Sequence, residues 1–320
     1  MKGKHNIIVQ NRRIQYKFTI ERNITVLKGD SATGKTTLIE MIAEYQSQGD
    51  DSGISVSCDK KCIVLSSQNW ELILTNTHDS IVFIDEGDDF VRSEDFARLA
   101  KQSDNYYVIA SRAKLNNLPY SVLEVYGIKN VSGNRYQGTK RLYSEFYPLY
   151  PTNIINRNKP DCVIVEDSNA GYEFFDSVCE KYKIACISAN GNSKVEQTVD
   201  ECNYENILVI ADGAAFGPYL EKLLDLKIIK NLGIYLPESF EWLILKSDII
   251  KNKEIHEVLL NPYDHIESGD YFSWEQFFND LLVEKSKDSI YAYNKKKINP
   301  VFLQKYEVDK ILRNTPFEWI

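Results

Sequence analysis

The sequence contains, at positions 29–36, the run Gly29-Asp30-Ser31-Ala32-Thr33-Gly34-Lys35-Thr36. This run fits the pattern G-x-x-x-x-G-K-[ST]. It stands between an apolar, β-branched stretch at 24–27 and a segment at 38–45 whose apolar residues recur with helical spacing. A glycine-rich turn between a strand and a helix presents backbone N–H groups and the positive end of the helix to an anion. The run therefore predicts a phosphate-binding P-loop within an α/β fold.

The residues of this P-loop have expected roles in binding a nucleotide. Lys35 is expected to reach the β- and γ-phosphates and to act in catalysis, and the Thr36 hydroxyl is expected to hold Mg²⁺. The predicted nucleotide-binding residues are Gly29, Asp30, Ser31, Ala32, Thr33, Gly34, Lys35, Thr36, Thr37 and, further along the chain, Arg112. We expect ATP with Mg²⁺, although the pattern itself does not distinguish ATP from GTP.

The composition predicts a cytoplasmic protein that does not enter a membrane. The 320 residues are enough for two domains, and no apolar run approaches the roughly 18 residues of a membrane span. The N-terminus lacks the apolar core of a signal peptide. Cys58 and Cys62 have no partner pair at zinc-ligand spacing, so the cysteines are expected to be reduced structural thiols.

Charge is distributed unevenly along the chain. Residues 1–150 hold 19 Lys+Arg and 18 Asp+Glu, whereas the remaining residues hold 19 Lys+Arg and 28 Asp+Glu. Nonspecific binding of nucleic acid depends on basic groups at phosphates, so the acidic second half argues against it there. The acids could instead hold a divalent metal.

A second motif is the run Ile81-Val82-Phe83-Ile84-Asp85-Glu86, which has the form of a Walker B strand. Four apolar residues followed by two carboxylates predict a buried parallel strand that carries the acids to the ligand-binding edge of the sheet. There Asp85 is expected to hold the Mg²⁺ shell, and Glu86 to act as the catalytic group that orients or deprotonates water. The alternative is a solvated strand end.

A further strand is predicted at 106–110, and it ends in Ser111-Arg112. Arg112 is expected to sense the γ-phosphate; alternatively it holds a neighbouring acid or is solvated. Asp88 and Asp89 extend the acidic run, and the sequence leaves open whether they form only a solvated turn. Another strand is predicted at 121–126.

Residues 6–130 resemble a compact ABC-type or AAA-type ATPase. The resemblance rests on a predicted leading β-hairpin, the P-loop and the Asp85-Glu86 pair. The chain departs from ABC proteins because nothing resembles their Leu-Ser-Gly-Gly-Gln signature. An ABC-type nucleotide-sandwich dimer is therefore not implied.

Prolines punctuate residues 148–160, which predicts a P-loop NTPase domain with a parallel sheet at 1–150 and a second domain at 160–320. Apolar stretches at 162–165, 184–187, 207–211 and 232–236 then alternate with helical patterns. This alternation predicts a small parallel α/β sheet, here with a C-terminal helical extension. Right-handed crossovers would bring Glu166, Asp212 and Glu241 to one edge, where they could hold a divalent cation.

Residues 160–250 resemble the Toprim fold of topoisomerases, primases and OLD-family nucleases. The first-strand glutamate of that family falls on Glu166, the first aspartate of its Asp-x-Asp motif on Asp212, and a later glutamate of OLD-like members on Glu241. The second aspartate position holds Ala214, and Asp167 is a neighbouring acid that could partly compensate. The resemblance thus implies a Mg²⁺ site with catalytic Glu166 and Asp212 that lacks one carboxylate.

An ATPase followed by a Toprim domain is the order of OLD-like proteins, which implies nucleic-acid cleavage and antiviral defence. The leading hypothesis is that ATP binding and hydrolysis in the first domain control a Mg²⁺-dependent nuclease in the second, acting on DNA or tRNA, in a homo-oligomer. The alternative is a nucleotide-controlled switch whose inactive Toprim-like domain binds a partner protein. A small-molecule kinase is a third option, although the Asp85-Glu86 pair suits water activation better. The run Lys295-Lys296-Lys297 is expected to form a solvated basic turn; the alternative is that it contacts phosphate.

Overall fold

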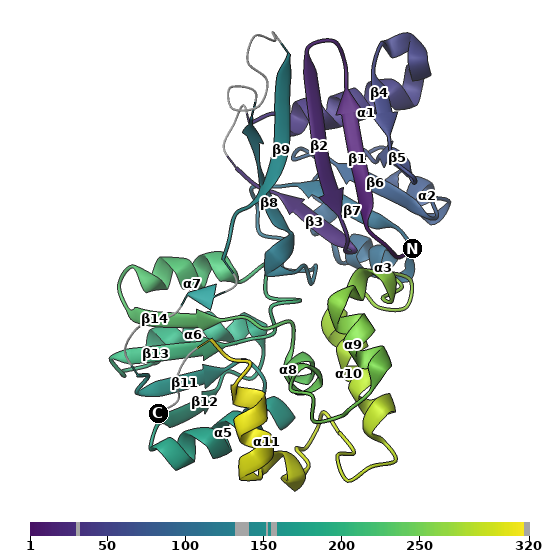
Figure 1. Cartoon of the computed structure of the whole chain (residues 1–320). Coiled ribbons are helices and arrows are strands. Elements are labelled where there is room, and N and C mark those ends of the chain that lie inside the picture. Colours follow the sequence, from purple (N-terminus) through teal and green to yellow (C-terminus); the bar gives the residue numbers. More distant parts are fainter. Residues whose placement is uncertain (30–32, 132–140, 152, 155–158, 317–320) are drawn as a thin grey trace. The chain divides into compact units, whose positions relative to one another are not determined.

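The computed structural model describes residues 1–29, 33–131, 141–151, 153–154 and 159–316 (Figure 1). The chain divides into two compact units. Unit 1 comprises Met1–Tyr150 and Asn261–Phe272, and unit 2 comprises Pro151–Leu260 and Ser273–Ile320. The predicted second domain at 160–320 did not anticipate that a segment from the second half of the chain packs in unit 1.

Unit 1 is built on a mixed sheet, which has nine strands among the described residues in the order β4-β1-β2-β9-β8-β3-β7-β6-β5. The strands are β1 His5–Gln10, β2 Ile14–Ile20, β3 Ile24–Leu27, β4 Ser55–Ser57, β5 Lys61–Val64, β6 Ser80–Ile84, β7 Tyr106–Ala110, β8 Val125–Asn130 and β9 Leu142–Pro148. The run from β8 to β5 is parallel. The parallel sheet expected for the first domain is confirmed for this run only, because the β1–β2 hairpin, β4 and β9 extend the same sheet with antiparallel pairs.

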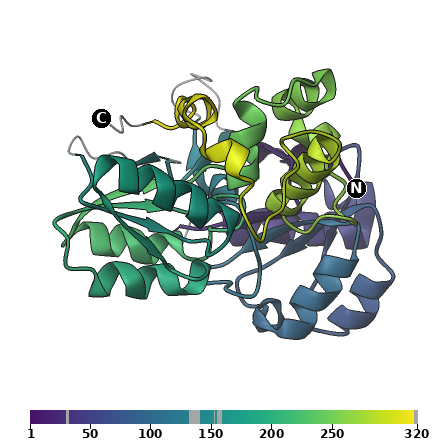
Figure 2. The same ribbon diagram turned by 90° about the horizontal axis from the view of Figure 1, so that it is seen from below.

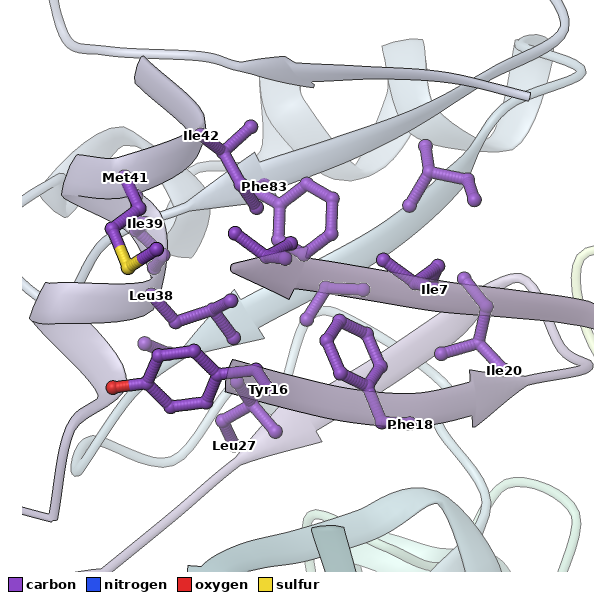
Figure 3. Close-up of a cluster of buried hydrophobic side chains, with 14 of the residues drawn as sticks. Ile7, Tyr16, Phe18, Ile20, Leu27, Leu38, Ile39, Met41, Ile42 and Phe83 are labelled. Carbon is purple, nitrogen blue, oxygen red and sulfur yellow. The ribbon is translucent and has the colours of Figure 1, made fainter. Parts of the chain in front are cut away.

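Apolar clusters cover both faces of the sheet in unit 1. Side chains alternate along a strand, so Ile81 and Phe83 of β6 enter one cluster while Val82 and Ile84 enter the other. Helix α1 (Lys35–Gln48) packs with the β1–β2 hairpin in the first cluster, which Figure 3 shows. Helix α3 (Glu94–Gln102) packs in the second cluster, and α2 (Trp70–Thr75) lies beside it. Burial of this kind contributes about 1.5–3 kcal/mol for each large apolar side chain and holds the strand ends in place.

The predicted strands of unit 1 are confirmed at 24–27, 81–84 and 106–110. The strand expected at 121–126 differs, because Val122–Glu124 forms a short 3-10 helix and β8 begins only at Val125. The Ser121 hydroxyl accepts a hydrogen bond from the Leu123 backbone N–H and so stabilises that turn.

Unit 2 contains a five-stranded sheet of the order β10-β14-β13-β11-β12 among the described residues. The strands are β10 Asn153–Ile154, β11 Cys162–Val165, β12 Ala185–Ser188, β13 Asn206–Ile210 and β14 Asn231–Tyr235. All pairs are parallel except β10 with β14, which confirms the predicted alternation of strands and helices. Helix α5 (Ala170–Tyr182) lies on one face, and α6 (Val195–Glu201) and α7 (Leu220–Lys227) lie on the other (Figure 2).

The remaining helices of unit 2 are α8 Phe240–Lys246, α9 Lys253–Leu260, α10 Trp274–Ser286 and α11 Lys305–Leu312. Helix α8 packs against both α10 and α11. Ser239 caps α8, because its hydroxyl accepts a hydrogen bond from the Trp242 backbone N–H. In the part of the chain that the structure describes, no helix combines the length and the apolar character needed to cross a membrane.

Candidate functional site

The carboxyl ends of three parallel strands bring the sequence motifs of unit 1 together. Strand β7 lies between β3 and β6, with Leu27 opposite Ala110 and Ile84 opposite Ile109. The P-loop follows β3, Asp85 follows β6, and Arg112 follows β7. All three motifs therefore lie at one edge of the sheet, as the sequence predicted for parallel strands.

The described part of the P-loop has the backbone shape that its glycines allow. Gly29 has φ 125° and Gly34 has φ 94°, both in the region that favours glycine. The Lys35 ammonium donates to the Gly29 carbonyl oxygen at 2.6 Å and to the Thr33 hydroxyl at 3.3 Å. Asp30, Ser31 and Ala32, which the sequence analysis includes in the site, lie outside the described residues.

The N-terminus of α1 is suited to an anion. The helix has 14 residues, its first turn contains no acid, and no side chain caps it. The partial positive charge of its first N–H groups is therefore not offset by an acid of the helix's own first turn. Lys35 lies in the first turn and is buried, which adds a cation next to these donors.

Tyr16 on β2 forms a hydrogen bond with the end of the P-loop, and sequence reasoning missed this residue. Its hydroxyl donates to the Gly34 carbonyl oxygen at 3.0 Å and also interacts with the Thr37 side chain. Burial raises the pKa of Tyr16 to about 12, so it remains a neutral donor. A Cβ atom on Gly34 would lie only 2.7 Å from this hydroxyl oxygen, so Gly34 is required by close contact as well as by its φ.

The two acids of the predicted Walker B motif have different partners. The Asp85 Oδ1 atom lies 3.5 Å from the Thr36 hydroxyl, and it also accepts a 2.8 Å hydrogen bond from the Glu86 backbone N–H. The Glu86 carboxylate forms an ion pair with Arg112 at 2.7 Å. In this structure Arg112 therefore takes the alternative role considered from sequence, that of holding a neighbouring acid.

Asp88 and Asp89, whose roles the sequence left open, have local structural contacts. Asp88 Oδ1 accepts from the Ser67 backbone N–H at 2.8 Å and from its hydroxyl at 2.6 Å. Asp89 pairs with Arg92 on the surface. The Asp88 contacts join the loops that follow β5 and β6, whereas the Asp89 pair is local to one turn.

The second candidate site lies at the switch point of the sheet in unit 2. The chain runs from β11 outward to β12 and then crosses back to β13, so β11 and β13 are neighbours from which connections leave in opposite directions. Ligands of open α/β sheets bind in the crevice at such a point. Glu166 directly follows β11, and Asp212 follows β13. They line a small pocket together with Asp167, Phe175, Pro237 and Phe240.

Five carboxylates of unit 2 interact electrostatically, and we call them the acidic cluster: Glu166, Asp167, Asp212, Glu241 and Glu275. Burial, and then the charges of Glu275 and Asp167, raise the pKa of Glu166 to about 7. Burial and the neighbouring carboxylates raise the pKa of Asp212 well above its usual range. The cluster therefore disfavours its own negative charge unless a cation is present.

Lys295 lies in the expected turn, but its side chain is half-buried rather than solvated and supplies a cation to the acidic cluster. Burial by itself would lower the pKa of Lys295, but the carboxylates of Glu241, Asp212 and Glu275 outweigh that effect and raise it. The Lys295 backbone carbonyl accepts a 3.0 Å hydrogen bond from the Ala170 N–H at the start of α5. Lys296 and Lys297 are exposed, as expected.

Glu241 is buried on α8, where it is only 2% exposed. One carboxylate oxygen accepts a 2.8 Å hydrogen bond from the Tyr293 hydroxyl, and the other, Oε2, has no hydrogen-bond partner among the described residues. Sequence reasoning included Glu241 but missed Tyr293, Lys295 and Glu275. None of these three follows a predicted strand, so no local pattern distinguished them.

The suggestion that Asp167 partly compensates for the acid missing at Ala214 stays a prediction, and its carboxylate also has structural partners. The Asp167 carboxylate accepts from the backbone N–H groups of Ser168, Asn169 and Gly171 and from the Asn169 side chain. It therefore organises the entry into α5. Glu275 is a further acid of the cluster, which sequence reasoning did not include.

The acids of unit 2 do not form a compact coordination shell. Among the described residues, no three His, Cys, Asp or Glu side chains are grouped closely enough to hold a metal ion. The sequence matches no protein-family model, and a search of curated proteins finds no significant match. The functional assignment therefore depends on the residues of the two sites.

Proposed function

We propose that unit 1 binds ATP with Mg²⁺ and hydrolyses it. The observation that carries this proposal is that one sheet edge holds the P-loop, the Thr36–Asp85 contact and the Glu86–Arg112 pair. The uncapped, acid-free N-terminus of α1 adds donors for phosphate at the same edge.

The residues at this edge fit a magnesium nucleotide. Thr36 and Asp85 offer hard oxygen donors 3.5 Å apart, and Mg²⁺ prefers such ligands. When bound, Mg²⁺ would neutralise phosphate charge. Lys35 would exchange its contact with the Gly29 carbonyl for phosphate oxygens, and Glu86, once released from Arg112, would orient and deprotonate the attacking water.

The test is calorimetric titration with ATP and Mg²⁺, followed by an assay of phosphate release without any acceptor. Lys35→Ala should remove nucleotide binding, whereas Glu86→Gln should retain binding and lose hydrolysis. Lys61→Ala, which changes an exposed lysine on β5, is the matched control and should bind as wild type does. Undiminished affinity in Lys35→Ala would refute the proposal.

We further propose that nucleotide state controls unit 2, with a Mg²⁺-dependent nuclease as its first candidate activity. The support is a pocket at the switch point of the sheet, lined by Glu166 and Asp212. The Glu241 Oε2 atom, unpartnered among the described residues, adds a buried oxygen in electrostatic contact with Asp212. Carboxylate oxygens suit Mg²⁺, which would replace protons as the charge balance of these acids.

The nuclease test uses the full chain with ATP and Mg²⁺ or Mn²⁺ on plasmid, single-stranded DNA and tRNA. A fragment of residues 160–320 is unsuitable, because Asn261–Phe272 would lose its packing partner in unit 1. Glu166→Ala should abolish cleavage and leave ATP hydrolysis intact, while Glu180→Ala, at an exposed site on α5, should leave both intact. A Glu166→Ala protein that cuts as wild type does would exclude this site.

The alternative is a nucleotide-controlled switch whose inactive second unit binds a partner protein. Three points favour it. The Toprim resemblance implies an acid where this chain has Ala214. The Lys295 ammonium already offsets the acidic cluster, and no three-ligand group occurs among the described residues. The full chain would then hydrolyse ATP, and wild type and Glu166→Ala would bind the same amount of Mn²⁺.

A further inference from the structure

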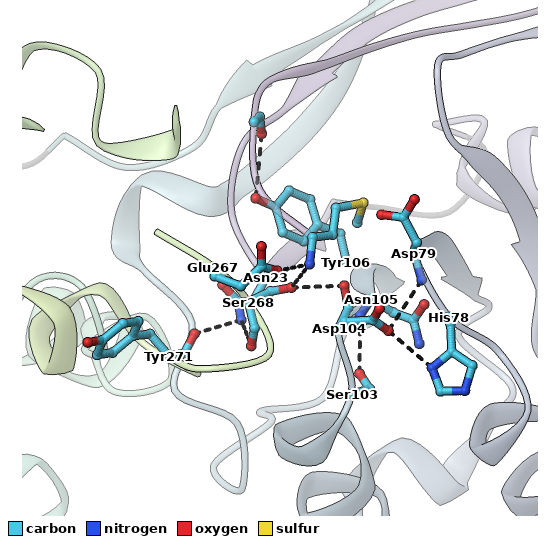
Figure 4. Close-up of polar contacts among 12 residues, drawn as sticks. Asn23, His78, Asp79, Ser103, Asp104, Asn105, Tyr106, Glu267, Ser268 and Tyr271 are labelled. Carbon is cyan, nitrogen blue, oxygen red and sulfur yellow. Dashed lines mark hydrogen bonds and ion pairs between the residues drawn. The ribbon is translucent and has the colours of Figure 1, made fainter. Parts of the chain in front are cut away.

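The segment Asn261–Phe272 forms hydrogen bonds with residues at the amino ends of two strands in unit 1, β3 and β7. The Asn23 side-chain amide donates to the backbone carbonyls of Ser268 at 3.3 Å and Tyr271 at 2.9 Å. The Ser268 hydroxyl donates to the Asp104 carbonyl at 2.9 Å (Figure 4). Asn23 precedes β3, and Asp104 lies just before β7. The segment therefore holds both strands at their amino ends.

Further contacts fix the segment along its length. The Gly3 backbone N–H donates to the Tyr263 carbonyl at 2.8 Å. The amino group of Met1 pairs with Glu267 and donates to the Ser268 hydroxyl at 2.9 Å. Phe272, at the end of the segment, is only 7% exposed and belongs to the apolar cluster that contains β3 and β7 side chains. The segment is thus part of the core of unit 1 rather than a loose loop.

The two strands that the segment holds are also the strands that lead into the candidate nucleotide site. β3 ends at the P-loop, and β7 ends at Ser111 and Arg112, the partner of Glu86. Both strands are short, four and five residues, and they are joined to each other by the Tyr107 N–H to Asn23 carbonyl bond of 2.7 Å. The carboxyl ends of these strands therefore lie within about 17 Å of their amino ends, at roughly 3.3 Å per residue.

The chain continues from this segment directly into the acidic cluster of unit 2. Ser273 is the only residue between Phe272 and the start of α10 at Trp274. Glu275, in the first turn of α10, interacts with Asp212 and Lys295. A chain extends at most about 3.3–3.6 Å per residue, so three residues from Phe272 to Glu275 leave little slack to absorb a movement.

We propose that Asn261–Phe272 is a coupling segment that positions Glu275 according to the nucleotide state of unit 1. The inference rests on the proposed nucleotide binding and specifies how its signal reaches unit 2. Nucleotide binding draws the P-loop and Arg112 toward phosphate, which shifts β3 and β7 against the segment that holds them. Phe272 follows its cluster, and Glu275 changes its distance from Asp212, Glu241 and Lys295, which alters the field in the pocket.

The test measures hydrogen exchange in peptides of α10 and of residues 166–171, in the full chain, without nucleotide and with a non-hydrolysable ATP analogue and Mg²⁺. Wild type should show nucleotide-dependent protection in both. Insertion of Gly-Ser-Gly-Ser between Phe272 and Ser273 should abolish this difference, while affinity for the analogue stays within about twofold. The same insertion between Leu260 and Asn261 is the matched control and should retain the difference.

A pair of asparagine variants tests the inference without changing chain length. Asn23→Ala removes the two hydrogen bonds to the coupling segment and should reduce the nucleotide-dependent protection of α10 by more than half. Asn117 also donates two hydrogen bonds to backbone carbonyls in unit 1, those of Val91 and Ser93, rather than to the segment. Asn117→Ala should leave the protection of α10 unchanged.

The outcomes separate the inference from the proposed function. If wild type binds the analogue and the 272/273 insertion keeps full protection of α10, the coupling route is wrong and nucleotide binding stands. If wild type binds the analogue but α10 does not respond, the inference also fails. If wild type does not bind nucleotide, the proposed function and the coupling segment both fail.

Discussion

The contact between Gly34 and Tyr16 yields a prediction that does not depend on any ligand. In Gly34→Ala, the new Cβ would lie 2.7 Å from the Tyr16 hydroxyl oxygen and 3.5 Å from the nearest ring carbons. The φ of 94° costs an L-residue about 1–2 kcal/mol in any surroundings. Overlap with a buried side chain adds about 1–3 kcal/mol, because the ring is packed between β2 and α1.

A double-mutant cycle separates these two contributions. Tyr16→Phe removes the overlapping oxygen and its hydrogen bond to Gly34, which by itself costs about 0.5–1.5 kcal/mol. In the Tyr16→Phe background, Gly34→Ala should then cost only the backbone part, so the coupling free energy should be about 1–3 kcal/mol. The readout is urea unfolding followed by hydrogen exchange in β2 and α1 peptides, which reports unit 1 alone. Equal cost of Gly34→Ala in both backgrounds would show that the hydroxyl contact is not a constraint.

Three further predictions concern the charged groups of the two sites. Glu86→Gln should release Arg112 for phosphate and tighten ATP but not ADP binding by about 1.5- to 5-fold in calorimetry, since an exposed pair contributes about 0.2–1 kcal/mol; equal tightening of ADP would contradict this. Glu166 has a folded pKa of about 7, above its ordinary 4.5, so the folded state binds more protons in that window and unit 2 should lose stability as pH rises through it. Glu166→Gln should reduce the change in the free energy of unfolding across this window by at most about 3 kcal/mol, at about 1.4 kcal/mol per pKa unit. Urea curves that are identical at pH 5 and pH 8 for both proteins would refute this prediction. Lys295→Met should raise the pKa of Glu166 further in a carbon-13 NMR titration, because the ammonium lowers it, whereas Lys295→Arg should preserve it.

The sequence by itself determined the local elements of both units. The strand before the P-loop, the helix after it and the strand that ends in Asp85 each depend on periodicity and turn residues within about 15 positions, and all three are present. The alternation after residue 160 likewise predicted the parallel strands and the placement of Glu166 and Asp212 at strand ends. Parallel strands that are connected by right-handed crossovers bring such residues to one edge without further information.

Only the tertiary structure decided which distant residues join these edges. Tyr16 reaches the P-loop because β2 and α1 pack in the same apolar cluster. Glu275 and Lys295 interact with Asp212, although neither residue directly follows a strand. The return of Asn261–Phe272 to unit 1 depends on hydrogen bonds to Asn23 and Asp104, more than 150 residues away. Periodicity records which face of an element is buried but not which element covers it, so contacts at this separation are determined by packing of the whole chain.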